Sequence, residues 1–218
     1  MGSEMCIRDR TMPLSAVTDY SRRLKEAGLL STGARGVNAP EMTPLDAARL
    51  LLAVLTTPSP AQCVERVQRF GQIKYSPNFR KRYQGYETIQ PEEFGTLFQG
   101  ETLEEVLASL FGLPQQIGIV PACVWFQENV FHLRVHDFEV LAELYSWVMA
   151  EDRSTIIGER VVPFKGKIYA DHTEGQLPRP VEGWIPIKGG VRTTREFAAI
   201  QFSAIGFGLM HNPKEGGS

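Results

Sequence analysis

The chain has 218 residues, of which 43% are hydrophobic and 22% are charged, and its formal net charge is −2. This composition excludes an intrinsically disordered chain, which would contain fewer apolar residues and carry more net charge. No apolar run approaches the roughly 18–20 residues that span a bilayer. Three cysteines are also too few for a disulfide framework in a chain of this size. We therefore expect a folded cytoplasmic protein with no membrane partner.

The first eleven residues differ in character from the rest. The run MCIRDR at 5–10 resembles a translated mosaic-end sequencing adapter. This resemblance implies that 1–11 is a non-native tail, and we assign no function to it. The remaining sequence predicts a helical portion over 12–113, an α+β portion over 114–212 and a flexible tail over 213–218.

Three helices are predicted in the N-terminal portion. Apolar residues recur at helical spacing from Leu14 to Ala27, and Gly28 follows where a helix-ending glycine belongs. The second helix begins at Thr43-Pro44-Leu45-Asp46, in which threonine can cap the helix and proline fits the first turn. Ser59-Pro60-Ala61-Gln62 has a capping-box pattern and predicts the start of the third helix.

The second and third helices are joined by only a few residues, 56–59. This short joint is compatible with a helix-turn-helix, in which the third helix would present Gln62, Arg66 and Arg69 to DNA. An ordinary helical hairpin has the same pattern, so that alternative stays open.

The segment from Arg66 to Tyr86 contains six basic residues, five aromatic residues and no acid. Clustered cations attract phosphate, and exposed rings give nucleic-acid bases a surface on which to stack. We therefore predict a nucleic-acid-binding segment, with Lys74 to Tyr86 forming a long loop. The predicted contacts are Arg66, Arg69, Lys74, Tyr75, Phe79, Arg80, Lys81, Arg82, Tyr83 and Tyr86.

A second candidate precedes this segment. VTDYSRRLKEAGLLSTGARG, at 17–36, resembles the recognition helix and wing of bacterial winged-helix regulators. The resemblance implies that Thr18, Ser21, Arg22 and Lys25 face the major groove and that Arg35 lies at the tip of the wing. The chain departs from that family because the family places two helices before its recognition helix. A solvated surface helix ended by glycine would have the same pattern.

Acidic residues follow the basic segment. From Glu87 to Leu133 the chain has seven glutamates and no lysine or arginine. The part from Glu87 to Glu105 could bind a protein partner, and its helix from Glu101 to Phe111 could mimic a phosphate backbone. Alternatively, these acids could pair with the basic segment inside the fold.

The C-terminal portion shows β signals after a boundary at 114–118. Strands are predicted at 120–127, 130–136, 160–164, 167–170 and 184–188, with a hairpin turn at 165–166. Residues 137–150 are ambiguous, because their apolar residues keep a helical period. A capping-box pattern at 193–196 predicts a buried final helix that runs to about Met210.

The only residues that suggest an enzyme are histidines. His132 and His136 are predicted to share one face of a strand, and His172 could join them around a metal ion. Histidines at a sheet surface with no catalytic role have the same spacing. We find no motif for a nucleophile, a metalloprotease or a phosphate loop, and we predict no cofactor.

The sequence thus predicts an α+β fold with an N-terminal helix-turn-helix-like portion and an antiparallel sheet against which a C-terminal helix packs. The favoured function is a nucleic-acid-binding regulator or accessory protein of bacterial or phage origin, with DNA favoured over RNA. A protein-binding inhibitor or assembly factor and a small metal-dependent enzyme are the alternatives.

Overall fold

The computed structural model describes residues 14–32, 42–76, 86–88, 100–129, 132–136, 140–151, 155–166 and 194–198. The helices in these ranges are α2 (Leu14–Glu26), α3 (Pro44–Thr56), the 3-10 turn η1 (Pro60–Gln62), α4 (Cys63–Gly71), α5 (Leu103–Phe111), α6 (Leu113–Ile117) and α7 (Ile119–Glu128). The strands are β1 (Lys74–Tyr75), β2 (Tyr86–Thr88), β3 (His132–His136), β4 (Leu141–Met149), β5 (Ile156–Lys165) and β6 (Thr194–Ala198).

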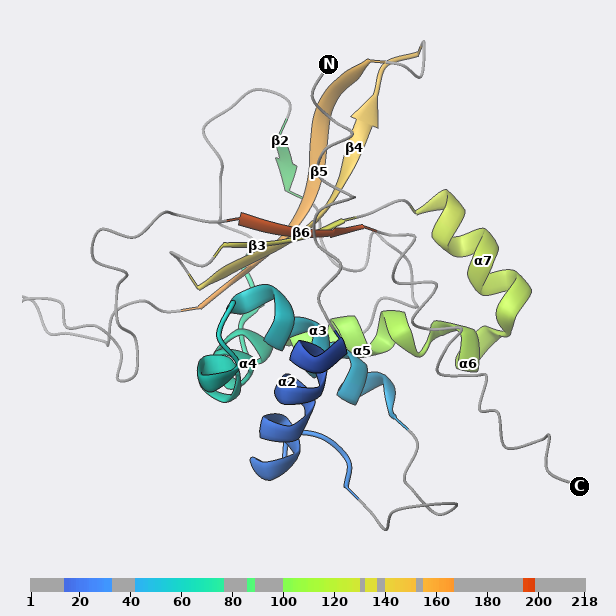
Figure 1. The fold of residues 1–218 in the computed structure, drawn as a ribbon. Helices are drawn as coiled ribbons and strands as arrows, with labels where there is room; N and C mark the ends of the chain where they lie inside the picture. The colour runs from blue at the N-terminus through green and yellow to red at the C-terminus, as the bar shows by residue number, and fades with distance from the viewer. Residues whose placement is uncertain are drawn as a thin grey trace, which may run out of the picture.

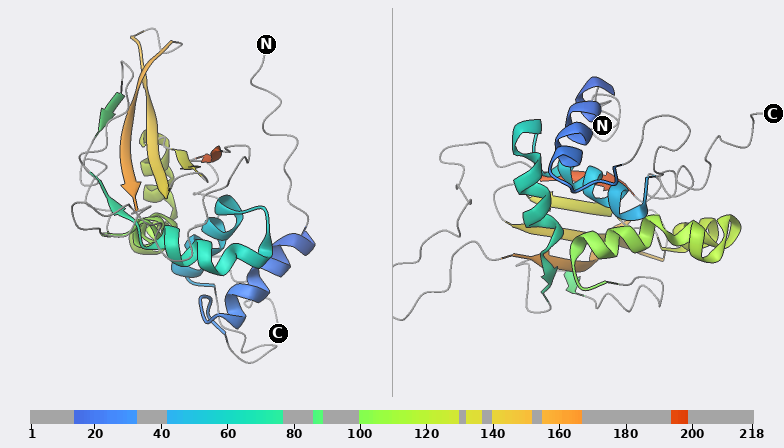
Figure 2. Two further views of the ribbon diagram at one scale, coloured as in Figure 1. Left: turned by 90° about the vertical axis from the view of Figure 1, so that its left-hand side faces the viewer. Right: turned by 90° about the horizontal axis from the view of Figure 1, so that it is seen from below.

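The described elements form two layers, a sheet and a group of helices on one of its faces (Figures 1 and 2). The strand order is β1-β5-β4-β3-β6, and each of these neighbouring pairs is antiparallel. β2 also pairs with β5, in the parallel sense. Helix α3 lies against the sheet beside α4 and α5, α2 packs on α3 and α4 farther from the sheet, and α6 and α7 extend to one side (Figure 1). The predicted α+β fold with an antiparallel sheet is confirmed.

The two shortest strands lie along the same edge of β5. Lys74 of β1 is opposite Lys165, near the end of β5, while Tyr86 of β2 is opposite Glu159, nearer its start. The other edge of β5 is occupied by β4. Two strands of the N-terminal portion, β1 and β2, therefore join the sheet whose other strands come from the C-terminal portion.

The hydrophobic core lies between the helices and the sheet. Alternate strand residues face the helices because successive side chains of a strand point to opposite faces. The buried cluster combines these strand residues with helix residues such as Leu52, Val67 and Leu107. Its members from the sheet are Leu133, Val135, Ala142, Leu144, Val162 and Phe164.

The predicted ends of the first two helices are confirmed. Gly28 has φ 71°, and the Leu29 amide donates to the Leu24 carbonyl oxygen at 2.8 Å, which is the hydrogen bond that closes a Schellman turn. Thr43 and Asp46 form a full capping box at the start of α3, with Pro44 in the first turn.

The capping box predicted at Ser59 is wrong. The Ser59 side chain caps nothing, and η1 precedes α4. The Thr57 side chain instead accepts a hydrogen bond from the Ser59 amide at 3.1 Å and lies 3.3 Å from the Gln62 side chain. A threonine just outside the predicted motif therefore organises this turn.

The strand predicted at 120–127 is also wrong, because these residues belong to α7. The boundary predicted at 114–118 lies largely within α6. Valine, tryptophan and phenylalanine suggested a strand, but Ala122 and Phe126, four residues apart, are the two that α7 buries. Burial on one helical face outweighs the strand propensity.

Two helical patterns in the C-terminal portion are strands. The segment 137–150, whose apolar residues repeat at helical spacing, contains β4. Five consecutive residues of this strand, from Leu141 to Tyr145, are buried. A strand buried on both faces loses its two-residue alternation and can imitate a helix. The predicted final helix is wrong over 194–198, which forms β6, and its remainder lies outside the described residues.

The predicted long loop between Lys74 and Tyr86 begins in β1 and ends in β2. The strand predicted at 160–164 is the second half of β5, and the strand at 130–136 contains β3. The strands predicted at 167–170 and 184–188 lie outside the described residues.

Leu52 should be a sensitive reporter of the core, because it is fully buried where α3 meets α4 and α5. We expect Leu52→Ala to lower the free energy of unfolding by about 2–5 kcal/mol, measured by urea denaturation. Val120→Ala, at a position that is 73% exposed, should change it by less than about 0.5 kcal/mol. Equal effects of the two substitutions would contradict this description of the core.

Candidate nucleic-acid interface

Helix α2 has one polar exposed face and one buried apolar face. Thr18, Arg22 and Lys25 are exposed and follow one another at i, i+4 and i+7, so they lie along one stripe. Tyr20 and Leu24 are buried on the opposite side. These three exposed residues are called the α2 surface below. The structure brings together three of the residues that the winged-helix resemblance selected, while Ser21 is half-buried beside them and Arg35 lies outside the described residues.

Acidic side chains lie beside the α2 surface. Arg22 lies 2.9 Å from Glu26 and 3.8 Å from Asp19, and all three side chains are more than half exposed. Exposed pairs of this kind contribute only about 0.3–0.5 kcal/mol, so phosphate could replace them at little cost.

Buried contacts attach α2 to the helices behind it. The Tyr20 hydroxyl donates to the Thr57 carbonyl oxygen at 2.8 Å, in the joint between α3 and η1. Leu24 and Leu30 are buried in the common core. These contacts therefore attach the helix that carries the α2 surface to the core.

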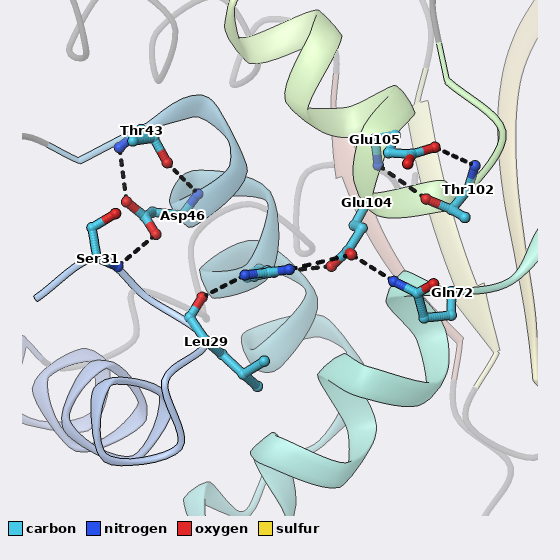
Figure 3. A network of polar contacts seen from close by, with 9 residues as sticks. Leu29, Ser31, Thr43, Asp46, Gln72, Thr102, Glu104 and Glu105 are labelled. Atoms are coloured by element: carbon cyan, nitrogen blue, oxygen red, sulfur yellow. Dashed lines mark hydrogen bonds and ion pairs between the residues drawn. The ribbon is translucent and has the colours of Figure 1, made fainter.

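A polar network continues this attachment beyond the end of α2 (Figure 3). The Arg49 guanidinium donates to the Leu29 carbonyl oxygen at 3.0 Å and to the Glu104 carboxylate at 3.0 Å. Glu104 also accepts from the Gln72 amide at 2.6 Å. Gly71 permits this approach, since a Cβ there would lie 2.8 Å from a Glu104 oxygen. Four segments distant in sequence thus meet at one ion pair.

Asp46 provides a second attachment. Its carboxylate accepts hydrogen bonds from the amides of Thr43 and Ser31, each at 2.9 Å. Burial tends to raise the pKa of Asp46, but these backbone hydrogen bonds outweigh burial and hold the pKa below its ordinary value. One carboxylate therefore caps α3 and also fixes the chain that leaves α2.

The basic residues of α4 are less available than predicted. Gln62 is exposed, but Arg66 and Arg69 are half-buried. The side chain of Arg69 is only 13% exposed and lies 4.0 Å from Glu65. This burial lowers the pKa of Arg69. The face of α4 that was predicted to read DNA is thus partly covered.

Lys74 is paired within the fold. Its ammonium lies 2.9 Å from Glu101, and this hydrogen bond and charge raise the pKa of Lys74. Tyr75 is half-buried in β1. The predicted contacts Phe79, Arg80, Lys81, Arg82 and Tyr83 lie outside the described residues, and Tyr86 begins β2.

Three glutamates of the acidic segment have roles inside the fold. Glu101 pairs with Lys74, and Glu104 pairs with Arg49. Glu105 accepts from the amides of Glu101 and Thr102, and these hydrogen bonds hold its pKa below the ordinary value. Of these three, only Glu101 forms the predicted ion pair with the basic segment, because Glu104 pairs with Arg49 and Glu105 accepts from backbone amides. A protein partner for Glu87–Glu105 stays a prediction.

The sheet face opposite the helices contains a polar cluster that the sequence did not reveal. His132 and His136 share this face, as predicted, and Arg134 lies between them on β3. Its guanidinium lies 3.4 Å from Glu143, 3.2 Å from Glu159 and 4.0 Å from the centre of the Tyr145 ring.

The two histidines have different surroundings. His136 lies 3.2 Å from the carboxylate of Glu143, which is fully buried. The His132 ring stacks on Tyr145 and lies 4.5 Å from the Trp147 ring. Within the ranges that the structure describes, no group of three or more histidine, cysteine or acidic residues could hold a metal ion, and His172 lies outside them. Register across β3, β4 and β5 could have linked these residues, but it was not readable from the sequence.

Comparisons with protein-family models, with curated proteins and with solved structures find no match to this chain. In the described part of the chain, no helix combines the length and the apolar character that crossing a membrane requires.

Asp46→Asn should reveal the role of the double cap. The low pKa of Asp46 means that its ionised form stabilises the fold above the ordinary value of 3.8, and that this stabilisation is lost as the pH falls through the lower native pKa. We expect the variant to lose about 1–2 kcal/mol at pH 7, measured by urea denaturation. The difference in free energy of unfolding between the variant and the unmodified chain should shrink towards pH 3. A difference independent of pH would contradict this role.

The Arg49–Glu104 pair can be tested by a double-mutant cycle. Glu104→Gln should cost about 1–3 kcal/mol, because the largely buried guanidinium loses its charged acceptor. Arg49→Met should cost less in the Glu104→Gln background than alone, since the partner has already been removed. Additive costs from urea denaturation would show that the two residues do not act together.

Proposed function

We propose that the protein binds nucleic acid through the α2 surface, with duplex DNA as its target. The observation that carries this proposal is the exposed stripe of Thr18, Arg22 and Lys25 on a helix whose other face is buried. Basic residues contact phosphates, and a short polar side chain among them can reach a base edge in the major groove.

The attachment of α2 to the core supports the proposal. A recognition helix must hold its side chains in one register along the groove, so its support matters as much as its sequence. Tyr20 fixes the middle of α2 through Thr57, and Arg49 and Asp46 fix the chain that leaves it. The winged-helix resemblance of 17–36 agrees with this assignment and includes the same three residues.

The basic-aromatic segment contributes less to the proposal than the sequence suggested. Arg66 and Arg69 are half-buried, and Arg69 also lies near Glu65. Lys74 forms an exposed pair with Glu101, as Arg22 does with Glu26, so of these three residues only Lys74 remains as accessible as the α2 surface. Arg80, Lys81 and Arg82 form a second, separable contact in this proposal. A regulatory or accessory role would follow from sequence-dependent binding.

Reversing charge on the α2 surface should test the proposal. We expect Arg22→Glu with Lys25→Glu to weaken binding to a labelled mixed-sequence duplex at least tenfold. The slope of log affinity against log salt should become shallower by about 0.9 for each phosphate that the variant no longer neutralises. Fluorescence anisotropy over a salt series measures both quantities.

Two controls locate the interface. Lys74→Glu changes charge by the same amount per residue but lies on β1, away from α2, so it should leave the affinity within about twofold. The triple variant Arg80→Glu, Lys81→Glu, Arg82→Glu separates the two contacts. If only the triple variant loses binding, the α2 assignment is wrong and the basic-aromatic segment holds the DNA.

A further inference from the structure

The two cations of the α2 surface have different electrostatic surroundings. The Arg22 guanidinium lies 2.9 Å from the Glu26 carboxylate, one turn later in the helix, and 3.8 Å from the Asp19 carboxylate, one turn earlier. All three side chains are between 55% and 60% exposed. Lys25 is also exposed, but it belongs to no ion pair among the described residues. Arg22 is therefore flanked by acids, whereas the charge of Lys25 is not offset.

The charge around Arg22 disfavours a phosphate as its partner. One guanidinium between two carboxylates leaves this group with one net negative charge. A phosphate could displace either acid as the partner of Arg22, but both carboxylates would stay on the neighbouring turns and repel it. Lys25 has a charge that no ion pair offsets, so it is the better phosphate contact of the two.

The edge of a base pair suits such a group better, because it is uncharged and offers both acceptors and donors. In the major groove a G·C pair presents two adjacent acceptors, N7 and O6 of guanine, followed by the amino donor at N4 of cytosine. An A·T pair instead places its donor between two acceptors. Two neighbouring donors beside one acceptor therefore match G·C and not A·T.

Arg22 and Glu26 supply this combination of groups. The planar guanidinium can donate two parallel hydrogen bonds to N7 and O6 of guanine, and a carboxylate can accept from the cytosine amino group. The 2.9 Å hydrogen bond between the two side chains already holds them side by side, so less conformational entropy is lost on binding. Asp19 is a poorer partner, because its 3.8 Å separation from Arg22 is too long for a hydrogen bond.

We infer that Arg22 and Glu26 together read one G·C pair of duplex DNA. Arg22 donates to guanine and Glu26 accepts from cytosine, while Lys25 holds a phosphate. This inference rests on the proposed function and narrows its target to duplexes with a G·C pair at a fixed position. Sequence preference then comes from one cation of the α2 surface and general affinity from the other.

Selection of the full chain on a pool of randomised duplexes, with sequencing of the bound fraction, tests the inference. The unmodified chain should enrich a G·C pair at one position. Replacing that pair by A·T in a single labelled duplex should weaken binding about fivefold or more, measured by fluorescence anisotropy. Arg22→Gln should move the preference to A·T, because a glutamine amide pairs with N6 and N7 of adenine. Since Arg22 is exposed, this variant should keep the urea midpoint of the unmodified chain.

Lys25→Gln is the matched control, because it removes one positive charge from the same face of α2. It should weaken binding to all duplexes alike, make the salt slope shallower by about 0.9 and keep the G·C preference. Duplex binding without any base preference, or an unchanged preference in Arg22→Gln, would overturn this inference and leave the proposed function standing. A base preference that changes in Lys25→Gln instead would also overturn it. An unmodified chain that binds no duplex would overturn both.

Discussion

The ion pair between Arg49 and Glu104 lies where four segments of the chain meet. Arg49 belongs to α3 and Glu104 to α5, while Leu29 follows α2 and Gln72 follows α4. Largely buried charged groups require polar partners, and the carbonyl of Leu29 and the side-chain amide of Gln72 supply two of them. The position of α2 is therefore tied to the packing of the three helices behind it. Any surface that α2 presents depends on this arrangement.

The two faces of the sheet differ in polarity. Its face towards the helices is apolar and forms part of the core. Its other face holds Arg134 between two glutamates, with Glu143 completely buried. Buried charges tolerate few alternative pairings, because a shift in register would leave a carboxylate without its partner. The polar cluster thus helps to specify how β3, β4 and β5 align, while the apolar face supplies most of the burial.

The sequence was informative where local chemistry decides the structure. Thr43 with Asp46 and Gly28 after α2 stabilise helix ends through contacts within a few residues, so their patterns could be read directly. The same reasoning was wrong for α7 and β6, and it left the segment of β4 undecided. Their apolar residues are arranged by what each segment packs against, and a run buried on both faces has no period that distinguishes a strand from a helix.

The candidate sites also divide into features set by local sequence and features set by contacts between distant segments. The spacing of Thr18, Arg22 and Lys25 on one helical face is a local property, and the structure places all three on one exposed stripe. Arg134, Glu143 and Glu159 could not be grouped beforehand, because strand register brings together residues up to 25 positions apart. The pairing of Lys74 with Glu101 was foreseen only as one possibility among several, since it depends on β1 lying beside the start of α5.

By itself, the sequence determined the α+β class, the two capped helices and the polar stripe of α2, because each depends on contacts between near neighbours. Tertiary structure alone decided which basic residues remain exposed and which acids are buried. Those outcomes depend on contacts between distant segments, and the free energy of a charge or an apolar side chain is set by the surroundings that such contacts create.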